Sequence, residues 1–381
     1  MTDTVYSSSH PLLPPTSEDD RLGWLRLLRS HRVGVSTFYR LMAEHGSSSA
    51  ALSALPEVAR SAGIEKYSPC SMSEAEGEYR RGCAFGARLI CRGEAEYPPG
   101  LAELGDAPPL FWARGRIELL HKPLIALVGA RNASSLGTRM ARALAGELGE
   151  AGFVVVSGLA RGVDTAAHLA ALETGTIAVF GGGIDVIYPS ENTKLAEDIQ
   201  ARGLTLSEQR PGLAPQARHF PQRNRIISGL SRGVVVVEAA AKSGSLITAR
   251  NALDQGREVL AVPGHPFDAR ASGCNMLIRD GARLVRNAAD VIEALGPIAS
   301  APEVQPELPL LPEAPPERRD LRETAALHNE ILSRLGPSPL AEDQLIRDLR
   351  GASPSVAAEL TDLELSGRIT RHPGGLISLA S

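Results

Sequence analysis

Short apolar runs alternate with longer amphipathic stretches through the middle of the chain. Several runs are continuous in valine, isoleucine and leucine, which is typical of parallel strands covered on both faces. The predicted strands are Leu124–Val128, Phe153–Val156, Thr176–Phe180, Leu204–Ser207, Gly233–Glu238 and Glu258–Val262. The predicted helices between them are Leu136–Ala151, Val163–Glu173, Glu191–Arg202, Arg223–Leu230 and Ser245–Gln255. The alternation predicts an α/β core: a Rossmann-like, doubly wound, mainly parallel sheet over residues 91–295.

The chain before this core has a different pattern. Residues 1–19 are rich in serine, threonine, proline and acidic residues, and they predict a disordered tail. Residues 20–90 predict a small domain of short helices, similar to helix-hairpin-helix or sterile-alpha-motif (SAM) modules. The motif is weak, so a packing role for this domain is at least as well supported as a DNA contact.

The chain after the core falls into two parts. Seven prolines between Gly296 and Pro316 predict an extended linker over residues 296–320. Three helical stretches and two short strands follow within residues 321–381, and this combination predicts a winged-helix domain. The stretches are Leu321–Leu335, Leu340–Leu349 and Ser355–Leu365, and the strands are Arg368–Arg371 and Leu376–Leu379.

The distribution of charge changes the picture that net charge gives. A formal net charge of -4 argues mildly against a nucleic-acid ligand, because lysine and arginine contact the phosphates. However, Gln209–Val237 contains five arginines and no acid, and Leu119–Gly146 also lacks acids. One such segment would suit a solvated face, but two of them beside glycine-rich turns of one sheet favour an anionic ligand there.

Other classes of site have little support in the composition. The four cysteines have neither CxxC spacing nor a matching histidine cluster, so we expect neither a metal nor a cofactor. The N-terminus lacks the features of a signal peptide, and no apolar run approaches the roughly 18 residues of a membrane span. We therefore expect a cytoplasmic protein with reduced thiols and no membrane span.

Glycine-rich turns follow the predicted strands, at the edge where open parallel sheets bind ligands. In the first turn, Gly129 permits a tight bend, Arg131 supplies a charge, and the next helix should offer free N–H groups to an anion. The turn is not GxGxxG, which disfavours a dinucleotide. The second turn runs from Ser157 into Asp164 and His168, which share a helical face. No nucleophile accompanies this pair, so we predict a structural role for it and no catalytic residue.

Two later segments supply the chemistry that a single strand of DNA needs. The segment from His219 to Leu230 combines Phe220 with two arginines at the start of a helix. An arginine can contact phosphate, and an aromatic ring can stack on an unpaired base. The segment from Ser243 to Ala249 adds a helix start that is rich in hydroxyl groups.

Seven strings along the chain together resemble the core motifs of the DNA-processing protein A (DprA/Smf) family. They are GAR at 129–131, SGLARGVDTAAH at 157–168, GGGIDVIYP at 181–189, FPQRNRIISGLS at 220–231, VEAAAKSGSLITA at 237–249, AVPGH at 261–265 and SGCNMLIRDGA at 272–282. One string alone would be weak, but seven in this order are specific. In one departure, Ser190-Glu191-Asn192 places an acid where members often carry a lysine.

The resemblance implies a non-enzymatic protein that binds single-stranded DNA and loads RecA onto incoming or coated strands. Its implied partners are single-stranded DNA, RecA, single-strand-binding protein and a second copy of the chain. The implied DNA-binding residues are Gly129, Arg131, Ser157, Gly158, Arg161, Gly162, Phe220, Arg223, Asn224, Arg225, Lys242, Ser243 and Ser245. We further predict a dimer or RecA interface at Asn275, Met276, Leu277, Ile278, Leu284 and Val285, although packing of this segment against the sheet has almost equal support.

Two other functions remain open on the sequence alone. Related Rossmann-like nucleotide hydrolases carry a PGGxGTxxE string, whereas the corresponding region here has Glu238 without the paired glycines. A winged helix could also regulate transcription by reading duplex DNA. Its candidate recognition helix, Ser355–Leu365, contains three acids and no lysine or arginine, which suits a protein partner better than a major groove.

Overall fold

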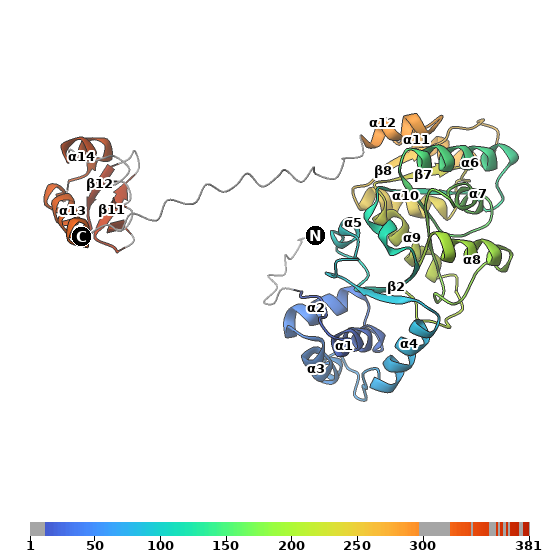
Figure 1. Ribbon diagram of the computed structural model, residues 1–381, viewed down its shortest axis with the longest axis horizontal. Helices are drawn as coiled ribbons and strands as arrows, with labels where there is room; N and C mark the ends of the chain where they lie inside the picture. The colour runs from blue at the N-terminus through green and yellow to red at the C-terminus, as the bar shows by residue number, and fades with distance from the viewer. Residues whose placement is uncertain are drawn as a thin grey trace. The chain divides into compact units, whose positions relative to one another are not determined.

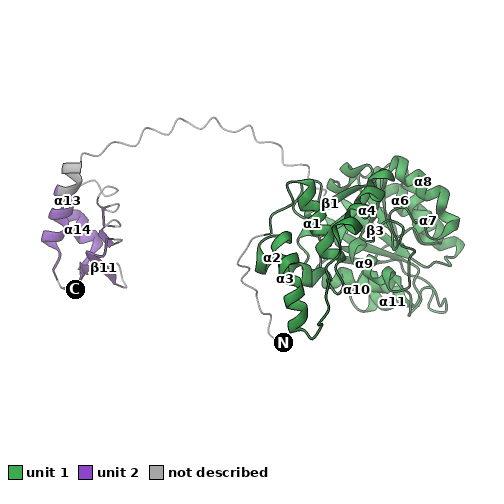
Figure 2. Cartoon of the chain, turned by 90° about the horizontal axis from the view of Figure 1, so that it is seen from below, with its two compact units in different colours: residues 1–299 green, residues 300–381 purple. Residues whose placement is uncertain are grey.

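A computed structural model describes residues 12–296 and most of residues 321–380. The chain divides into two compact units, residues 1–299 and 300–381 (Figure 2). Three predicted segments lie wholly or largely outside the described residues: most of the tail at 1–19, the linker at 296–320 and much of the helix at Ser355–Leu365. The predicted tail is too long, because the first helix begins at Glu18 after the N-cap residue Ser17. Within the described parts, no helix is both long and apolar enough to cross a membrane.

The first unit is built around a nine-stranded sheet with the order β1-β2-β6-β5-β4-β3-β7-β8-β9. Strands β3 to β9 pair in parallel, and the predicted Rossmann-like α/β core is confirmed. The six predicted strands are present with ends that differ by at most one residue. They are β3 (Leu124–Gly129), β4 (Val154–Ser157), β5 (Thr176–Val179), β6 (Leu204–Ser207), β7 (Gly233–Val237) and β8 (Glu258–Ala261).

Three strands of this sheet were not predicted from the sequence. β1 (Arg88–Cys91) and β2 (Leu110–Gly115) form an antiparallel extension, and β2 pairs with β6. The expected boundary between residues 90 and 91 falls inside β1. At the other edge, β9 (Arg283–Leu284) pairs with β8 over two residues.

Helices cover both faces of the sheet (Figure 1). The side chains of Ile125 and Leu127 in β3 face a core that includes α6 (Ser135–Glu150), α7 (Val163–Ala170) and α12 (Ala288–Leu295). The alternate residues Ala126 and Val128 face a second core on the opposite side. Its helices are α5 (Pro99–Ala102), α9 (His219–Leu230), α10 (Ser245–Asp254) and α11 (Ser272–Arg279).

In the core, two helices begin two or more residues away from their predicted starts. α9 begins at His219, one turn before the predicted start at Arg223, so Phe220 and Arg223 belong to the same helix. The helix predicted from Glu191 begins with a short 3-10 turn, and α8 proper covers Thr193–Arg202.

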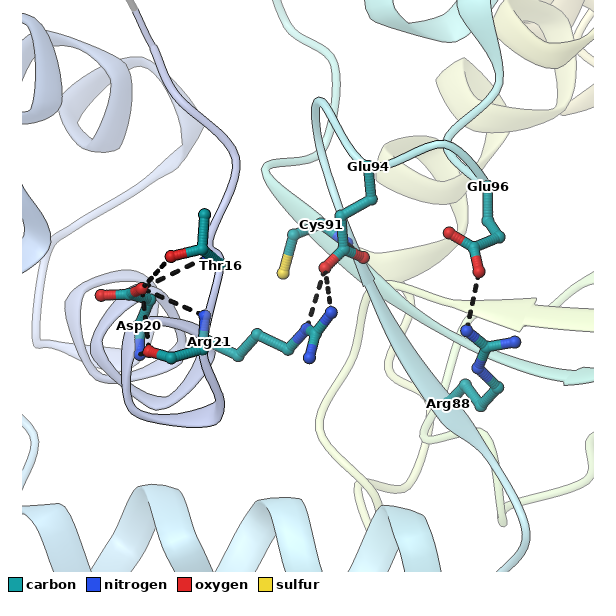
Figure 3. A network of polar contacts seen from close by, with 8 residues as sticks. Thr16, Asp20, Arg21, Arg88, Cys91, Glu94 and Glu96 are labelled. Atoms are coloured by element: carbon teal, nitrogen blue, oxygen red, sulfur yellow. Dashed lines mark hydrogen bonds and ion pairs between the residues drawn. The ribbon is translucent and has the colours of Figure 1, made fainter.

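Four N-terminal helices pack against the antiparallel edge of the sheet. They are α1 (Glu18–Arg29), α2 (Val35–His45), α3 (Ser48–Ser61) and α4 (Met72–Ala84). Their apolar side chains share one core with Leu110 and Trp112 of β2. Arg21 of α1 also forms an ion pair of 2.7 Å with Glu94, which follows β1 (Figure 3). The helical segment and the sheet are therefore joined by both apolar packing and charge.

The second unit is a small domain of helices and a short sheet. Helices α13 (Leu321–Arg334) and α14 (Glu342–Asp348) accompany the strands β10 (Leu340–Ala341), β11 (Ile369–His372) and β12 (Leu376–Leu379). The strands are antiparallel in the order β10-β12-β11. Ile331, Leu345, Leu360 and Ile377 meet in its core. This arrangement matches the predicted winged helix, except that Leu340 and Ala341 form the strand β10 instead of the start of the predicted helix Leu340–Leu349.

Candidate nucleic-acid interface

A cleft of about 890 Å³ opens at the carboxyl ends of the central strands. Three segments form its walls: the turn after β3, the beginning of α9 and the loop between β7 and α10. Eight of the thirteen predicted DNA-binding residues line this cleft. They are Gly129, Arg131, Phe220, Arg223, Asn224, Lys242, Ser243 and Ser245.

An aromatic and arginine cluster occupies one wall of the cleft. The ring of Phe220 is half-buried, and a side chain at Gly181 would meet that ring at 3.0 Å. The guanidinium carbon of Arg131 lies 5.5 Å from the centre of the Phe220 ring. The ring of Tyr188, whose residue is 53% exposed, lies 5.6 Å from that of Phe220. The cluster places a cation beside the Phe220 ring, which in turn contacts a second aromatic ring in the lining of the cleft.

Arg223 holds this wall in place from beneath. Its side chain is buried, and it donates hydrogen bonds to the carbonyl oxygens of Gly158, at 2.7 Å, and Val179. A side chain at Gly158 would collide with the guanidinium group. Burial lowers the pKa of Arg223 to about 10, so the group stays charged at neutral pH. Arg223 therefore ties α9 to the ends of β4 and β5.

The second glycine-rich turn supports the cleft more than it lines it. One carboxylate oxygen of Asp164 accepts from the backbone N–H groups of Gly158 and Ala160, at 3.1 and 3.2 Å. Ser157 is buried, and its hydroxyl group donates to the carbonyl of Leu127. The Gly158 amide is thus committed to Asp164. Ser157 and Gly158, two of the thirteen predicted DNA-binding residues, do not line the cleft.

The three remaining predicted DNA-binding residues also lie outside the cleft lining. Arg161 is exposed and lies 3.6 Å from the carboxylate of Glu191. Gly162 packs so closely on the carbonyl of Ala130 that a side chain would collide there. Arg225 donates two hydrogen bonds, of 2.6 and 2.7 Å, to the carboxylate of Glu208. The charge of Arg225 is therefore compensated within the protein.

The start of α6, the helix after the turn that follows β3, carries a carboxylate that was not expected there. The backbone N–H of Ser134, the N-cap residue of α6, donates to the carboxylate of Glu238 at 2.8 Å, and its hydroxyl group donates to the same carboxylate. Glu238 has a φ of 57°, and a side chain at Gly137 would collide with its carboxylate. The chain's own carboxylate therefore lies beside this helix start, where it would repel an external anion. The expected anion site there stays a prediction.

The opposite wall is polar and basic. Lys242 is exposed there, and the hydroxyl oxygens of Ser243 and Ser245 lie 2.7 Å apart. Sequence reasoning missed Tyr188 and Arg270, which also line the cleft. Tyr188 belongs to one of the strings that resemble the family, so a signal for it was present. Arg270 lies between two of those strings and carried no such signal.

Asp164 and His168 have different hydrogen-bond partners. The Nδ1 atom of the buried His168 lies 2.7 Å from the hydroxyl oxygen of Thr176, which donates to the carbonyl of Val155. Burial lowers the pKa of His168 to about 3. The imidazole ring is therefore neutral at physiological pH and packs in the core, as predicted for a structural role. Among the described residues, no group of three or more His, Cys, Asp or Glu is arranged to hold a metal.

We expect His168 to make stability depend on pH. The unfolded chain binds a proton at His168 below about pH 6.5, whereas the folded chain does not until about pH 3. The free energy of unfolding should therefore fall by about 1.4 kcal/mol per unit as the pH is lowered within this window. Urea unfolding of wild type and of His168→Gln isolates this contribution, because other titrating groups cancel in the difference. A difference that does not change with pH would contradict a neutral buried histidine.

The predicted dimer or RecA surface is only partly exposed. The side-chain amide of Asn275 contacts the backbone of Gly264 through both its oxygen and its nitrogen, at 3.2 and 3.0 Å. Leu277 and Ile278 pack against the core of the sheet, and Val285 is fully buried. Of the six residues, Leu284 is exposed, and Asn275, Met276, Leu277 and Ile278 are half-buried.

Comparisons with known proteins agree with this architecture. Residues 88–296 match the family described as DNA recombination-mediator protein A, residues 18–80 match the DprA-like N-terminal HHH domain, and residues 314–375 match the DprA winged helix domain. DNA processing protein DprA of Streptococcus pneumoniae is 44% identical over 60% of this chain and 80% of that protein. Protein Smf of Escherichia coli is 39% identical over 74% of this chain and 75% of that protein.

Two solved structures also share the fold. The X-ray structure of DprA from Streptococcus pneumoniae has a TM-score of 0.53 and 35% identity, and the match covers 68% of this chain and 98% of that one. DprA from Helicobacter pylori, described by its single-stranded DNA binding mode, has a TM-score of 0.51 and 31% identity, over 55% of this chain and 95% of that one. The resemblance carried by the seven strings is thereby confirmed, and the chain belongs to the DprA/Smf family of DNA recombination-mediator proteins.

Proposed function

We propose that this chain binds single-stranded DNA in the cleft at the carboxyl ends of the central strands. The observation that carries the proposal is the cluster of Arg131, Phe220 and Tyr188 on one wall of the cleft. Rings of this kind can stack only on bases that are not already stacked within a duplex. A cation 5.5 Å from the Phe220 ring can meet the phosphate that accompanies a stacked base. The Helicobacter pylori relative, described by its binding mode for single-stranded DNA, adds support.

The proposed site requires no catalytic group. Its charged walls can hold a phosphate backbone, and the acidic side chain that lines it, Asp164, is committed to backbone N–H groups. We propose that the product of binding is a DNA strand in a form that RecA can take over, in the cytoplasm. Membership of a recombination-mediator family supports this step. The proposed partners are RecA, single-strand-binding protein and a second copy of this chain.

The dimer would raise the avidity of a short site without new DNA contacts. We propose that it forms beside α11 and β9, where Leu284 is exposed. Sedimentation of the full chain over a range of concentrations tests this part of the proposal.

Salt dependence distinguishes the arginines that contact phosphate from those that hold the fold. Replacing Arg131 with alanine should weaken binding to single strands of any sequence. It should also reduce the slope of log K against log salt by about 0.7, because one phosphate contact is lost. Arg225→Ala should leave that slope unchanged, since Arg225 pairs with Glu208. The measurement is a salt titration of the full chain with single-stranded and duplex DNA.

Two further measurements test the preference for single strands and the step that involves RecA. The wild type should bind single strands more tightly than duplex at every salt concentration, and Arg131→Ala should slow RecA filament formation on strands coated with single-strand-binding protein. A folded Arg131→Ala protein with unchanged affinity and slope would remove the cleft from the proposal. Equal affinity of the wild type for duplex would remove the preference for single strands.

A further inference from the structure

One phenylalanine stands apart from every core of the molecule. Phe267 is 95% exposed, the largest exposure among the large apolar side chains in the described part of the chain. It lies in the loop of residues 262–271, which follows β8 and which we call the Phe267 loop. β8 is parallel to β7, so this loop leaves the sheet at the same edge as the turns that line the cleft.

The Phe267 loop is held in place at both ends. Near its start, the side chain of Asn275 contacts both backbone polar groups of Gly264. Just after its end, the hydroxyl group of Ser272 accepts a hydrogen bond of 3.1 Å from the backbone N–H of Ala241, next to Lys242. The exposed ring is thus carried by a loop that is anchored to α11 and to the wall of the cleft.

The Phe267 loop repeats the combination of groups found on the opposite wall. The rings of His265 and Phe267 lie 5.5 Å apart, and the backbone N–H of Phe267 donates to Nδ1 of His265 at 3.3 Å. Arg270, three residues beyond Phe267, lines the cleft itself. Its guanidinium group forms an ion pair of 3.1 Å with Asp268, and both side chains are at least a third exposed. Such an exposed pair contributes little free energy, so a phosphate can replace Asp268 there, unlike Glu208 in the more buried pair with Arg225. An aromatic pair therefore adjoins a basic residue of the cleft.

The order of the strands in the sheet sets the order in which the basic residues and Phe267 follow one another along its edge. β3, β7 and β8 are neighbours in the sheet, and they lead to Arg131, to Lys242 and to Arg270 with Phe267, respectively. All three basic residues line the cleft, and the segments that carry them leave the sheet at the same edge. Phe267, three residues before Arg270, therefore lies on the β8 side of the cleft.

We propose that Phe267, with His265 beside it, is a second base-stacking platform that extends the binding site for single-stranded DNA beyond the cleft. This inference rests on the proposed function and adds the far end of the bound strand to it. The ring would stack on an unpaired base, and Arg270 would contact the phosphate between this platform and the cleft. Since stacking is tolerant of sequence, the platform lengthens the site without selecting a base.

Oligonucleotide length separates this platform from the cleft. With the full chain, Phe267→Ala should weaken binding of an oligothymidine of about 20 nucleotides roughly 5- to 100-fold, because one stacked base is lost. Binding of one of about 4 nucleotides, which the cleft alone can hold, should change by less than about twofold. Phe267→Trp should preserve affinity, and its fluorescence should be quenched by the long oligonucleotide, since Trp24 and Trp112 are buried. Leu253→Ala is the matched control, because Leu253 is 59% exposed at the far end of α10.

Each outcome bears on the platform or on the cleft separately. Unchanged binding of the long oligonucleotide by Phe267→Ala, with a loss in Phe220→Ala, would overturn the platform and leave the proposed function standing. A loss of equal size on both lengths would also overturn it, because the effect would then lie in the cleft. A change in sedimentation without a change in DNA binding would assign Phe267 to a protein partner and overturn the proposal. Failure of the wild type to bind either length would reject the proposed function itself.

Discussion

Replacing Arg223 with alanine is expected to lower the free energy of unfolding of the first unit by about 3–5 kcal/mol. The substitution removes the donor to the carbonyls of Gly158 and Val179. It also removes a positive charge that favours the ionised form of Asp164, whose pKa burial raises. Buried groups that lose their partners cost much more than an exposed ion pair contributes.

Urea unfolding followed by tryptophan fluorescence measures this effect directly. Both tryptophans, Trp24 and Trp112, are buried in the first unit, so the signal reports that unit alone. Gln222→Ala is the matched control, because Gln222 is the exposed neighbour of Arg223 in α9. Arg223→Lys should also be destabilised, since one ammonium group replaces the planar fork that reaches both carbonyls. A loss in Arg223→Ala no larger than that in Gln222→Ala would contradict this role.

Arg223 also separates support of the DNA site from contact with DNA. Because it is buried beneath the cleft wall, its loss should shift α9 and with it the ring of Phe220. We therefore expect weaker DNA binding in Arg223→Ala without the change in salt slope that Arg131→Ala produces. Arg223 and Arg131 lie in similar acid-free segments, but only Arg223 is buried. We therefore expect Arg223 to support the site and Arg131 to contact the DNA.

The parallel part of the fold could be predicted from the sequence because burial on both faces leaves a direct trace. A strand such as Gly233–Val237 is apolar at every position, and only a sheet covered on both sides explains that pattern. The antiparallel edge left no such trace. In β2, Phe111 and Trp112 face two different cores, one of them built with the N-terminal helices. That partnership depends on segments far apart in the chain.

The candidate site could be predicted at the level of segments but not of single residues. Sequence reasoning placed Arg131, Arg223 and Arg225 together because all three lie in stretches without acids and match positions that the family resemblance implies. Their partners are distant in sequence: Glu208 compensates Arg225, and the ends of β4 and β5 bind Arg223. Long-range contacts of this kind decide which charge remains available to a ligand. The same reasoning explains why Glu238, a residue of one of the family-like strings, was not expected to accept hydrogen bonds from Ser134, the N-cap residue of α6.

Phe220 should have the largest effect on DNA binding of any single residue of the cleft. Its ring adjoins Arg131, Tyr188 and Arg223, so its removal both deletes a stacking surface and releases the neighbours that it orients. We expect Phe220→Ala to weaken binding to single strands by about 1–3 kcal/mol, the usual cost of losing one stacked base. The slope of log K against log salt should stay unchanged, because stacking releases no counterions.

Two substitutions at the same position separate stacking from packing. Phe220→Tyr keeps the ring and should keep the affinity, whereas Phe220→Leu keeps apolar bulk without a π face and should lose nearly as much as alanine. Because the ring adjoins Arg131, the Phe220→Ala and Arg131→Ala effects should not be additive, and the double variant should lose less than their sum. If Phe220→Leu kept full affinity for single strands, the Phe220 ring would serve in packing and would not stack on a base. Strict additivity would mean that the arginine and the ring contact the strand independently, and the cluster would no longer act as one unit.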